Sequence, residues 1–368
     1  MYFDVANPEP VRTNDQRSGN RRKRDMTTEQ LKTKRDKAVS SDTRQKSGLT
    51  REQLLNAYRQ MRLIREFEDR VNAECLTGAI PGFTHLYSGQ EAVAVGACEQ
   101  MTDADYIIST HRGHGHCIAK GCDVIGMMKE LHARRDGLNG GKGGSMHIAD
   151  IAKGMLGANG IVGAGSPIAL GAAIACKLRG EGKVAASFVG DGASNQGTVF
   201  EAMNMAVVLK APKMFIFENN GYSEHTGASY GIGCDDVVKR IEGFGIPVFE
   251  ADGFDFFSMY EAVGKAMEIS RKGGGPTAIY ATTIRYFGHF VGDPQNYRAK
   301  GEVEMYRNEY CCLQNFRKRM KETGELDMAS LDAIDQEIGA LIERAVQEAR
   351  TAPRPLPEDL MKNVYDNY

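Results

Sequence analysis

Two strand candidates that end in polar residues constrain this chain more than any other feature of its sequence. The apolar run at residues 184–189 leads directly into Gly190-Asp191-Gly192, and the run at 214–217 leads into Glu218-Asn219-Asn220. A helical pattern over residues 197–210 separates the two, and this order predicts neighbouring parallel strands. Because ligands bind beyond the carboxyl ends of parallel strands, Asp191 and Asn220 are expected to meet at one site.

The rest of the hydrophobic pattern extends this alternation of strands and helices. It predicts an α/β fold, a parallel sheet with helices on both faces. Residues 90–135 are expected to be helical around a loop at 102–116, and 136–165 form a glycine-rich irregular stretch. Further strands are expected at 247–251 and 278–284, and helices at 166–179, 257–271 and 331–349. A capping box at Thr50–Gln53 predicts a long amphipathic helix that ends near Gly78.

The first 48 residues differ in composition from the remainder. Residues 1–47 hold 12 Lys or Arg and 7 Asp or Glu, a net charge of +5, and few apolar residues. We expect residues 1–48 to be a disordered basic tail and 49–368 to be the folded domain. The run from Arg21 to Arg24 could instead be a targeting or nucleic-acid patch, whereas seven acidic residues disfavour a mitochondrial transit peptide.

Composition also excludes several classes of protein. A net charge of −2 over 368 residues argues against a nucleic-acid partner. No apolar run approaches the roughly 20 residues of a membrane span, and no secretory signal is visible. The eight cysteines include no C-x-x-C pair, which favours reduced thiols and a cytoplasmic location.

The residue types at the two strand ends suit a divalent cation and a phosphate. A carboxylate, an amide oxygen and a backbone carbonyl are hard oxygen ligands, which Mg²⁺ prefers together with phosphate oxygens. Gly190 and Gly192 allow the backbone to approach a phosphate, and the helix that opens near Gly197 directs free N–H groups at the same place.

Together these residues resemble the thiamine-diphosphate fingerprint. The chain is similar to α subunits of E1 components of 2-oxo-acid dehydrogenase complexes and of acetoin dehydrogenase. The resemblance covers about residues 50–350 and rests on six blocks in family order: Pro81–Ala92, His111–Gly115, Gly141–His147, Asn159–Ala164, Gly190–Asn204 and Arg285–His289.

The resemblance implies a thiamine-diphosphate-binding fold, of which this chain is the diphosphate-binding half, and a role for each matching residue. Asp191, Asn220 and the carbonyl of Tyr222 would hold Mg²⁺. The diphosphate would contact Arg112, His289 and the backbone of Gly192 and Ala193, and the aminopyrimidine ring the backbone of Gly160 and Val162. His85 would lie at the reacting centre, with His289 as a second catalytic histidine. His111 stands where many pyruvate-type subunits have tyrosine, which leaves its contact with the cofactor open.

The resemblance also implies partners. The acid at the aminopyrimidine would be a glutamate of a β subunit, in an α₂β₂ heterotetramer that this chain needs for activity. The pattern Gly288-His289-Phe290-x-Gly292-Asp293 is similar to the acetoin branch. In that branch acetoin is cleaved to acetaldehyde, and the remaining hydroxyethyl group is oxidised and passed as acetyl to a lipoyl E2. Pyruvate or a branched 2-oxo acid is the alternative substrate.

Other interpretations of the same residues remain open. His111, His114 and His116 with Cys117 and Cys122 could form a zinc site, although their spacing matches no standard motif. Gly160-x-x-Gly163-x-Gly165 could be a dinucleotide loop of an NAD-dependent dehydrogenase, but it lacks the usual order after a strand. The chain could also be a non-catalytic scaffold. Phe290 stands where mammalian pyruvate enzymes carry a regulatory serine, so phosphorylation is not expected there.

Overall fold

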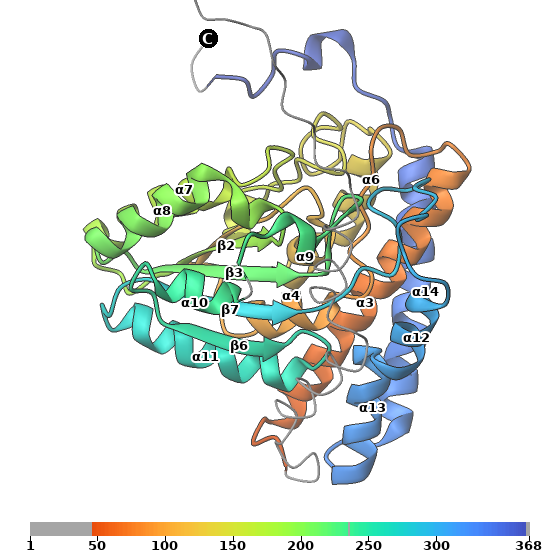
Figure 1. The fold of residues 1–368 in the computed structure, drawn as a ribbon. Coiled ribbons are helices and arrows are strands. Elements are labelled where there is room, and N and C mark those ends of the chain that lie inside the picture. The colour runs from red at the N-terminus through yellow and green to blue at the C-terminus, as the bar shows by residue number, and fades with distance from the viewer. Residues whose placement is uncertain (1–45, 235, 366–368) are drawn as a thin grey trace, which may run out of the picture. The chain divides into compact units, whose positions relative to one another are not determined.

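A computed structural model describes residues 46–234 and 236–365 of the chain. Its centre is a five-stranded sheet in the order β1-β2-β3-β7-β6, and every neighbouring pair of strands is parallel (Figure 1). The strands are β1 (Tyr106–Ile108), β2 (Ala185–Gly190), β3 (Lys213–Asn219), β6 (Val248–Asp252) and β7 (Thr277–Thr282).

Helices cover both faces of this sheet, so the predicted fold class is confirmed. Side chains alternate along β3: Phe215 and Phe217 belong to one apolar cluster, and Met214 and Ile216 to the other. The first cluster includes residues of α7 (Gly165–Arg179), α8 (Gly197–Val208) and α10 (Val237–Glu242). The second includes residues of α4 (Glu91–Cys98) and α11 (Phe256–Arg271). Burial on both faces explains the continuous apolar runs in the sequence.

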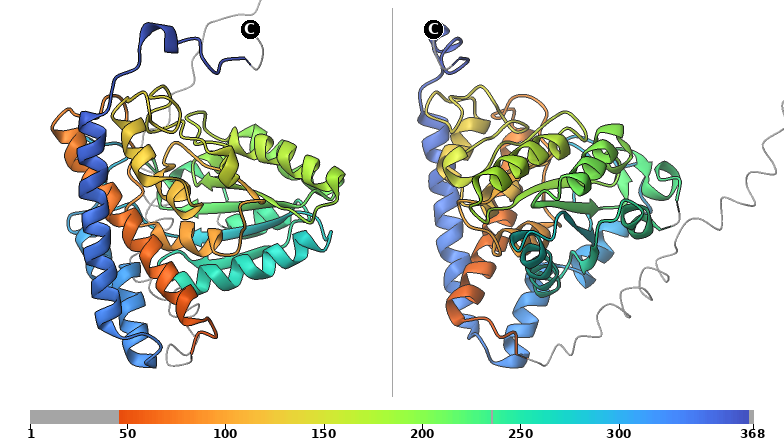
Figure 2. Two further views of the ribbon diagram at one scale, coloured as in Figure 1. Left: turned by 180° about the vertical axis from the view of Figure 1, so that it is seen from behind. Right: turned by 90° about the vertical axis from the view of Figure 1, so that its left-hand side faces the viewer.

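A further group of helices packs against α4 and shares the second apolar cluster. The long helix α3 (Arg51–Leu76) begins with the predicted capping box, in which Thr50 and Gln53 exchange hydrogen bonds of 2.9 and 3.2 Å. The last helix, α14 (Met328–Thr351), runs beside α3 (Figure 2). The remaining helices of this group are α5 (His114–Ala119), α6 (Val124–Leu131) and α13 (Cys312–Thr323).

Several short elements depart from the predicted pattern. β1 lies where a loop was expected, because its three residues gain their order from pairing with β2 rather than from a pattern of their own. The sequence pattern also did not reveal α10, α13, α12 (Glu302–Glu309), α9 (Ala228–Gly231) or the hairpin of β4 (Tyr222–Ser223) and β5 (Thr226–Gly227).

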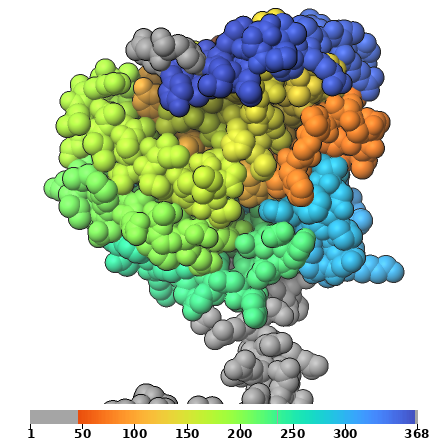
Figure 3. All heavy atoms as spheres, turned by 90° about the horizontal axis from the view of Figure 1, so that it is seen from above, coloured from red at the N-terminus to blue at the C-terminus, as the bar shows by residue number. Residues whose placement is uncertain are grey.

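The C-terminal segment that follows α14 lies against the glycine-rich stretch (Figure 3). Arg135 Nε lies 2.8 Å from Asp359 Oδ2, and Lys142 Nζ donates to the Asp359 carbonyl at 3.2 Å. No helix in the described part of the chain combines the length and apolar character that a membrane crossing requires. Residues 1–45, most of the predicted basic tail, lie outside the described residues.

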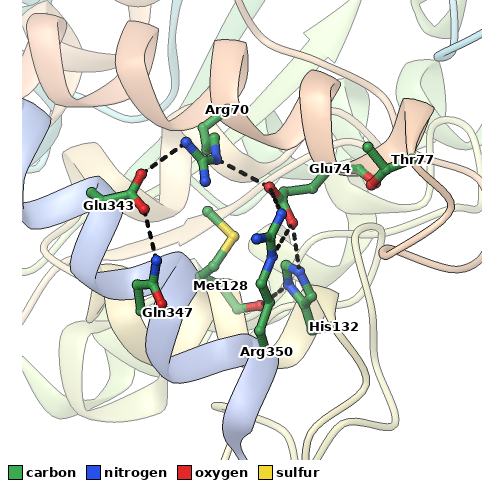
Figure 4. A network of polar contacts seen from close by, with 8 residues as sticks. All are labelled: Arg70, Glu74, Thr77, Met128, His132, Glu343, Gln347 and Arg350. Atoms are coloured by element: carbon green, nitrogen blue, oxygen red, sulfur yellow. Dashed lines mark hydrogen bonds and ion pairs between the residues drawn. The ribbon is translucent and has the colours of Figure 1, made fainter.

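One polar network joins α3, α6 and α14 (Figure 4). The Glu74 carboxylate, 2% exposed, accepts hydrogen bonds from Arg350 at 2.9 and 3.0 Å and from Arg70 at 3.1 Å. His132 Nε2 lies 3.4 Å from the same carboxylate. Burial favours the neutral acid, but hydrogen bonds from Arg350, His132 and Arg70 hold the pKa of Glu74 below its usual value. Glu74 therefore stabilises the packing of the three helices only as a carboxylate.

Replacing Glu74 by alanine is expected to lower the free energy of unfolding by about 1–3 kcal/mol, because it removes the acceptor of the buried His132 and of the partly exposed Arg350 and Arg70. Urea unfolding followed by far-UV circular dichroism measures this loss at pH 7. Since the folded pKa is depressed, the contribution of Glu74 is present above the unfolded pKa and fades as the pH falls through the folded value. The control is Glu343→Ala in the same network, where an exposed pair with Arg70 is worth less than about 1 kcal/mol. Equal losses in both variants would contradict this account.

Candidate active site

The eleven residues singled out from the sequence all line one pocket at the carboxyl ends of β1, β2 and β3. They are His85, His111, Arg112, Gly160, Val162, Asp191, Gly192, Ala193, Asn220, Tyr222 and His289. The register of β2 and β3 pairs Gly190 with Glu218, so Asp191 and Asn220 leave neighbouring strands at almost the same level. Their convergence follows from strand pairing across 29 residues of sequence.

Asp191 is a buried carboxylate with an unsatisfied oxygen. Its Oδ2 atom has no hydrogen-bond partner among the described residues, and the residue is only 6% exposed. Burial raises the pKa of Asp191 to about 6, although backbone hydrogen bonds and the charges of Arg285 and Arg112 oppose this. An unpaired buried carboxylate is costly. A bound cation would remove that cost, so Asp191 fits the magnesium role that the resemblance implies.

Asn220 and Tyr222 complete an oxygen-rich set beside Asp191. The Asn220 Nδ2 group donates to Gln90 Oε1 at 3.1 Å, which fixes the orientation of the amide. Its Oδ1 atom accepts only the Tyr222 N–H, at 3.3 Å, among the described contacts, so one lone pair stays available. Gly192 lies against β4, where a Cβ atom would collide with the Ser223 side chain. The backbone at this point is therefore restricted to glycine.

Two buried arginines give the pocket region positive charge. Arg112 donates to the carbonyls of Leu86 at 2.6 Å and His289 at 2.9 Å, and no described carboxylate lies within ion-pair distance of it. Burial and the charge of Arg285 lower the pKa of Arg112 to about 9. Arg285 is fully buried, and its Nε and Nη1 groups have no partner within the described structure. Two such guanidiniums suit an anionic ligand.

Arg285 belongs to a matching sequence block, but sequence reasoning assigned it no role. Its Nη2 group donates to the Glu224 carbonyl at 2.6 Å and to the Tyr297 hydroxyl at 3.1 Å. It does not line the pocket, yet its charge lowers the pKa values of Arg112 and Asp191. Arg285 directly follows the strand that the sequence predicts at residues 278–284, and this position at a strand end could have indicated a site residue.

Three histidines from distant segments gather at the pocket. The ring centroids of His85 and His111 lie 4.6 Å apart, those of His85 and His289 5.0 Å, and those of His111 and His289 5.2 Å. Burial, together with the charge of Arg112, lowers their pKa values to about 3 for His85, about 2 for His111 and about 4 for His289. All three imidazoles are therefore neutral near pH 7.

The histidines of α5 are turned away from this group. His114 Nδ1 lies 2.9 Å from Glu68 and its Nε2 2.9 Å from Ser145. His116 bonds to Ser109 at 2.6 Å and to Glu218 at 3.2 Å. The zinc site considered for His111, His114, His116, Cys117 and Cys122 is thus not assembled, because the two α5 histidines face separate glutamates.

Glu218 and Ser109 are pocket residues that the sequence did not single out as site residues. Both line the pocket, and the Tyr87 hydroxyl also donates to Glu218. His116 joins them from behind, with its ring stacked 3.6 Å from that of Phe188. The alternative dinucleotide loop at Gly160–Gly165 follows an irregular segment rather than a strand, so its structural context does not support NAD binding.

Comparisons with known proteins identify the family of the chain. The model of the family described as "Dehydrogenase E1 component" matches residues 59–358. The chain belongs to the dehydrogenase E1 component family. Membership implies thiamine diphosphate as the cofactor.

Three relatives show where in the family it lies. The α subunit of acetoin:2,6-dichlorophenolindophenol oxidoreductase of Cupriavidus necator is 52% identical over 320 residues, 87% of this chain and 96% of that protein. Its counterpart in Bacillus subtilis is 46% identical over 321 residues, with the same two shares. The pyruvate dehydrogenase E1 α subunit of Rhizobium meliloti is 39% identical over 315 residues, 86% and 90% of the two chains.

Replacing Asp191 by asparagine is expected to stabilise the cofactor-free chain at pH 7 by about 2–3 kcal/mol, because the ionised carboxylate is buried without a partner. The folded pKa lies above the unfolded one. The cost is therefore complete above the folded value of about 6 and disappears below the unfolded value of about 4. Urea unfolding at about pH 7 and about pH 5 should show a smaller gain at the lower pH.

Asp293→Asn is the matched control for this prediction. Hydrogen bonds from His289, Gln295 and Tyr297 outweigh burial and hold the pKa of Asp293 below its usual value. Its replacement should therefore destabilise the chain at pH 7. Destabilisation by Asp191→Asn would contradict the description of that carboxylate.

Proposed function

We propose that this chain is the α subunit of a thiamine-diphosphate-dependent E1 dehydrogenase that cleaves acetoin, and that it acts together with a β subunit. The observation that supports this proposal is that a negative group and a positive group, both without an oppositely charged partner among the described residues, line the same pocket. The unsatisfied Asp191 carboxylate favours a cation, and Arg112, without a carboxylate partner among the described residues, favours an anion. Arg285 does not line the pocket, but its positive charge acts on both residues. A magnesium diphosphate supplies both charges to adjacent strand ends.

In this proposal each pocket residue has one task. Asp191, the Asn220 amide oxygen and the Tyr222 carbonyl would hold Mg²⁺. Arg112, His289 and the backbone of Gly192 and Ala193 would hold the diphosphate, while the backbone of Gly160 and Val162 would face the aminopyrimidine ring. Thiamine diphosphate, when bound, would supply a nucleophilic carbon that adds to a carbonyl and a thiazolium ring that accepts the electron pair of the cleaved bond.

The neutral histidines suit proton transfer at the substrate. When acetoin is cleaved, its hydroxyl group loses a proton as the carbon–carbon bond breaks and acetaldehyde leaves. His85 lines the pocket, and its imidazole, whose buried Nδ1 has no described hydrogen-bond partner, is proposed to accept that proton. Its pKa is lowered mainly by burial and then by the charge of Arg112. A bound diphosphate would offset that charge and make the imidazole a stronger base.

Two observations favour acetoin over a 2-oxo acid. The two acetoin relatives are 52% and 46% identical to this chain, against 39% for the pyruvate relative. The second observation is the Gly288–Asp293 sequence, which resembles the acetoin branch. In the structure the His289 N–H of this segment donates to Asp293 Oδ2 at 2.6 Å. A Cβ atom at Gly288 would lie 2.5 Å from that of Asp293, so this segment needs glycine there.

The surface beside the pocket favours a partner chain. Ile161 and Val162 are 71% and 47% exposed, and Ile168 on α7 is 46% exposed. Exposed apolar side chains at the rim of a binding site are typical of a protein interface. In the proposal a β subunit covers them, contributes the glutamate that acts on the aminopyrimidine, and forms an α₂β₂ assembly. The acetyl group would then pass to a lipoyl group on an E2 acyltransferase.

The test is to co-purify the chain with its β-type subunit and to measure turnover of acetoin and pyruvate with an artificial electron acceptor. We expect acetoin to be the faster substrate, with turnover dependent on thiamine diphosphate and Mg²⁺. Asp191→Ala should abolish Mg²⁺-dependent cofactor binding. Faster turnover of pyruvate would overturn the substrate, and unchanged cofactor binding by Asp191→Ala would favour a scaffold subunit. Binding of a nicotinamide cofactor but not of thiamine diphosphate would favour an NAD-dependent enzyme.

A further inference from the structure

The side chains of His85, His111 and His289 lie closer together than their proposed catalytic tasks require. Each ring offers one nitrogen, and these three atoms all lie within 4.8 Å of one another. Among the described residues they form the one group of three or more histidine, cysteine or acidic side chains close enough to share a metal ion. The three residues come from different segments, since His85 and His111 are 26 positions apart in the sequence and His289 follows β7.

Three imidazoles are a donor set for a borderline transition metal. Neutral imidazole nitrogen suits Zn²⁺, Cu²⁺, Ni²⁺ and Co²⁺, whereas Mg²⁺ prefers oxygen. Two nitrogens bound to one tetrahedral zinc ion lie about 3.4 Å apart at the usual Zn–N distance of about 2.1 Å. Metal binding would therefore require the three rings to draw closer together than they lie in this structure.

The rings are also available as ligands. His85 Nδ1 is buried and has no hydrogen-bond partner among the described residues. His85 is 5% exposed, while His111 and His289 are half-buried and line the pocket. The open side of the group faces that pocket, which leaves room for water as a fourth ligand, as in zinc sites with three protein ligands.

The surrounding charges are mixed. Arg112 and Arg285 act against a cation here, since both contribute to the low pKa of His289, whereas Asp293 raises it. The Arg112 guanidinium is directed to the carbonyls of Leu86 and His289 by two hydrogen bonds. The Asp293 carboxylate bonds to the His289 backbone N–H at 2.6 Å. A metal ion at this group is therefore expected to bind reversibly rather than permanently.

We infer that His85, His111 and His289 form a binding site for one divalent transition-metal ion such as Zn²⁺, open when the cofactor is absent. Occupancy would take away the histidines that the proposed function assigns to the diphosphate and the substrate. Zinc is then a reversible inhibitor that competes with thiamine diphosphate, a consequence that rests on the proposed function. The metal site itself does not depend on it.

The first experiment titrates the full-length chain, stripped of metal by a chelator, with Co²⁺ and records the visible absorption of tetrahedral cobalt. We expect one equivalent to give this absorption, Zn²⁺ to displace it, and Mg²⁺ to leave it unchanged. His111→Asn should weaken Co²⁺ binding at least about tenfold, and His85→Asn should do the same. The control is His147→Asn, an exposed histidine of the neighbouring glycine-rich stretch, which should bind Co²⁺ like the parent chain.

Far-UV circular dichroism of each variant ensures that a loss of cobalt binding is not a loss of folding. If one variant fails to fold, His289→Asn takes its place. No tetrahedral absorption in the parent chain would overturn the inference. Equal affinity in the parent chain and in folded His111→Asn would overturn it as well.

The second experiment measures Zn²⁺ inhibition of the enzyme assembled with its β-type subunit, at rising concentrations of thiamine diphosphate with Mg²⁺. Weaker Zn²⁺ inhibition at higher cofactor concentration would support competition between Zn²⁺ and the cofactor. Inhibition that does not depend on the cofactor concentration would overturn that competition. The two proposals fail separately. A chain that binds cofactor but no Co²⁺ contradicts only the metal site, whereas one that binds Co²⁺ but no cofactor contradicts only the proposed function.

Discussion

Parallel pairing of β2 with β3 is the constraint on which the rest of the site depends. The register that sets Gly190 beside Glu218 ends both strands at one edge of the sheet, so Asp191 and Asn220 leave the sheet together. The other pocket residues reach this edge from loops: Arg112 and His111 after β1, Gly160 and Val162 before α7, and His289 after β7. In the proposed function the sheet therefore positions the proposed cation ligands, and the loops bring the proposed anion-binding and reactive groups to them.

The site contains buried polar groups that have no partner among the described residues and that suit a ligand. Asp191 lines the pocket and has a buried oxygen without a hydrogen-bond partner among the described contacts. Such a group lowers the stability of the protein until a ligand satisfies it, so ligand binding is expected to stabilise the fold. Stabilising interactions elsewhere offset this loss of stability. The Glu74 network, for example, joins α3, α6 and α14, and its buried polar groups are paired.

The sequence predicted the frame of the molecule but not the supports of its site. The long apolar runs of β2 and β3 and the capped helix α3 were predicted because local pattern and tertiary burial agree there. β1 was missed because three residues carry no periodicity. Glu218 and His116 were missed because a buried hydrogen bond between residues 102 positions apart leaves no local signal in the sequence. The resemblance named the pocket residues individually. It did not predict that three histidines would share one small volume, since only folding brings His289 beside His111.

We propose that the pocket binds a metal–diphosphate pair between the ends of β2 and β3. The most direct measurement is anomalous diffraction from crystals of the enzyme assembled with its β-type subunit and soaked with thiamine diphosphate and Mn²⁺, a heavier substitute for Mg²⁺. We expect one manganese peak at bonding distance from Asp191, the Asn220 amide oxygen and the Tyr222 carbonyl. The diphosphate density should lie beside Arg112. A manganese peak away from Asp191 and Asn220, or cofactor density outside this pocket, would contradict it.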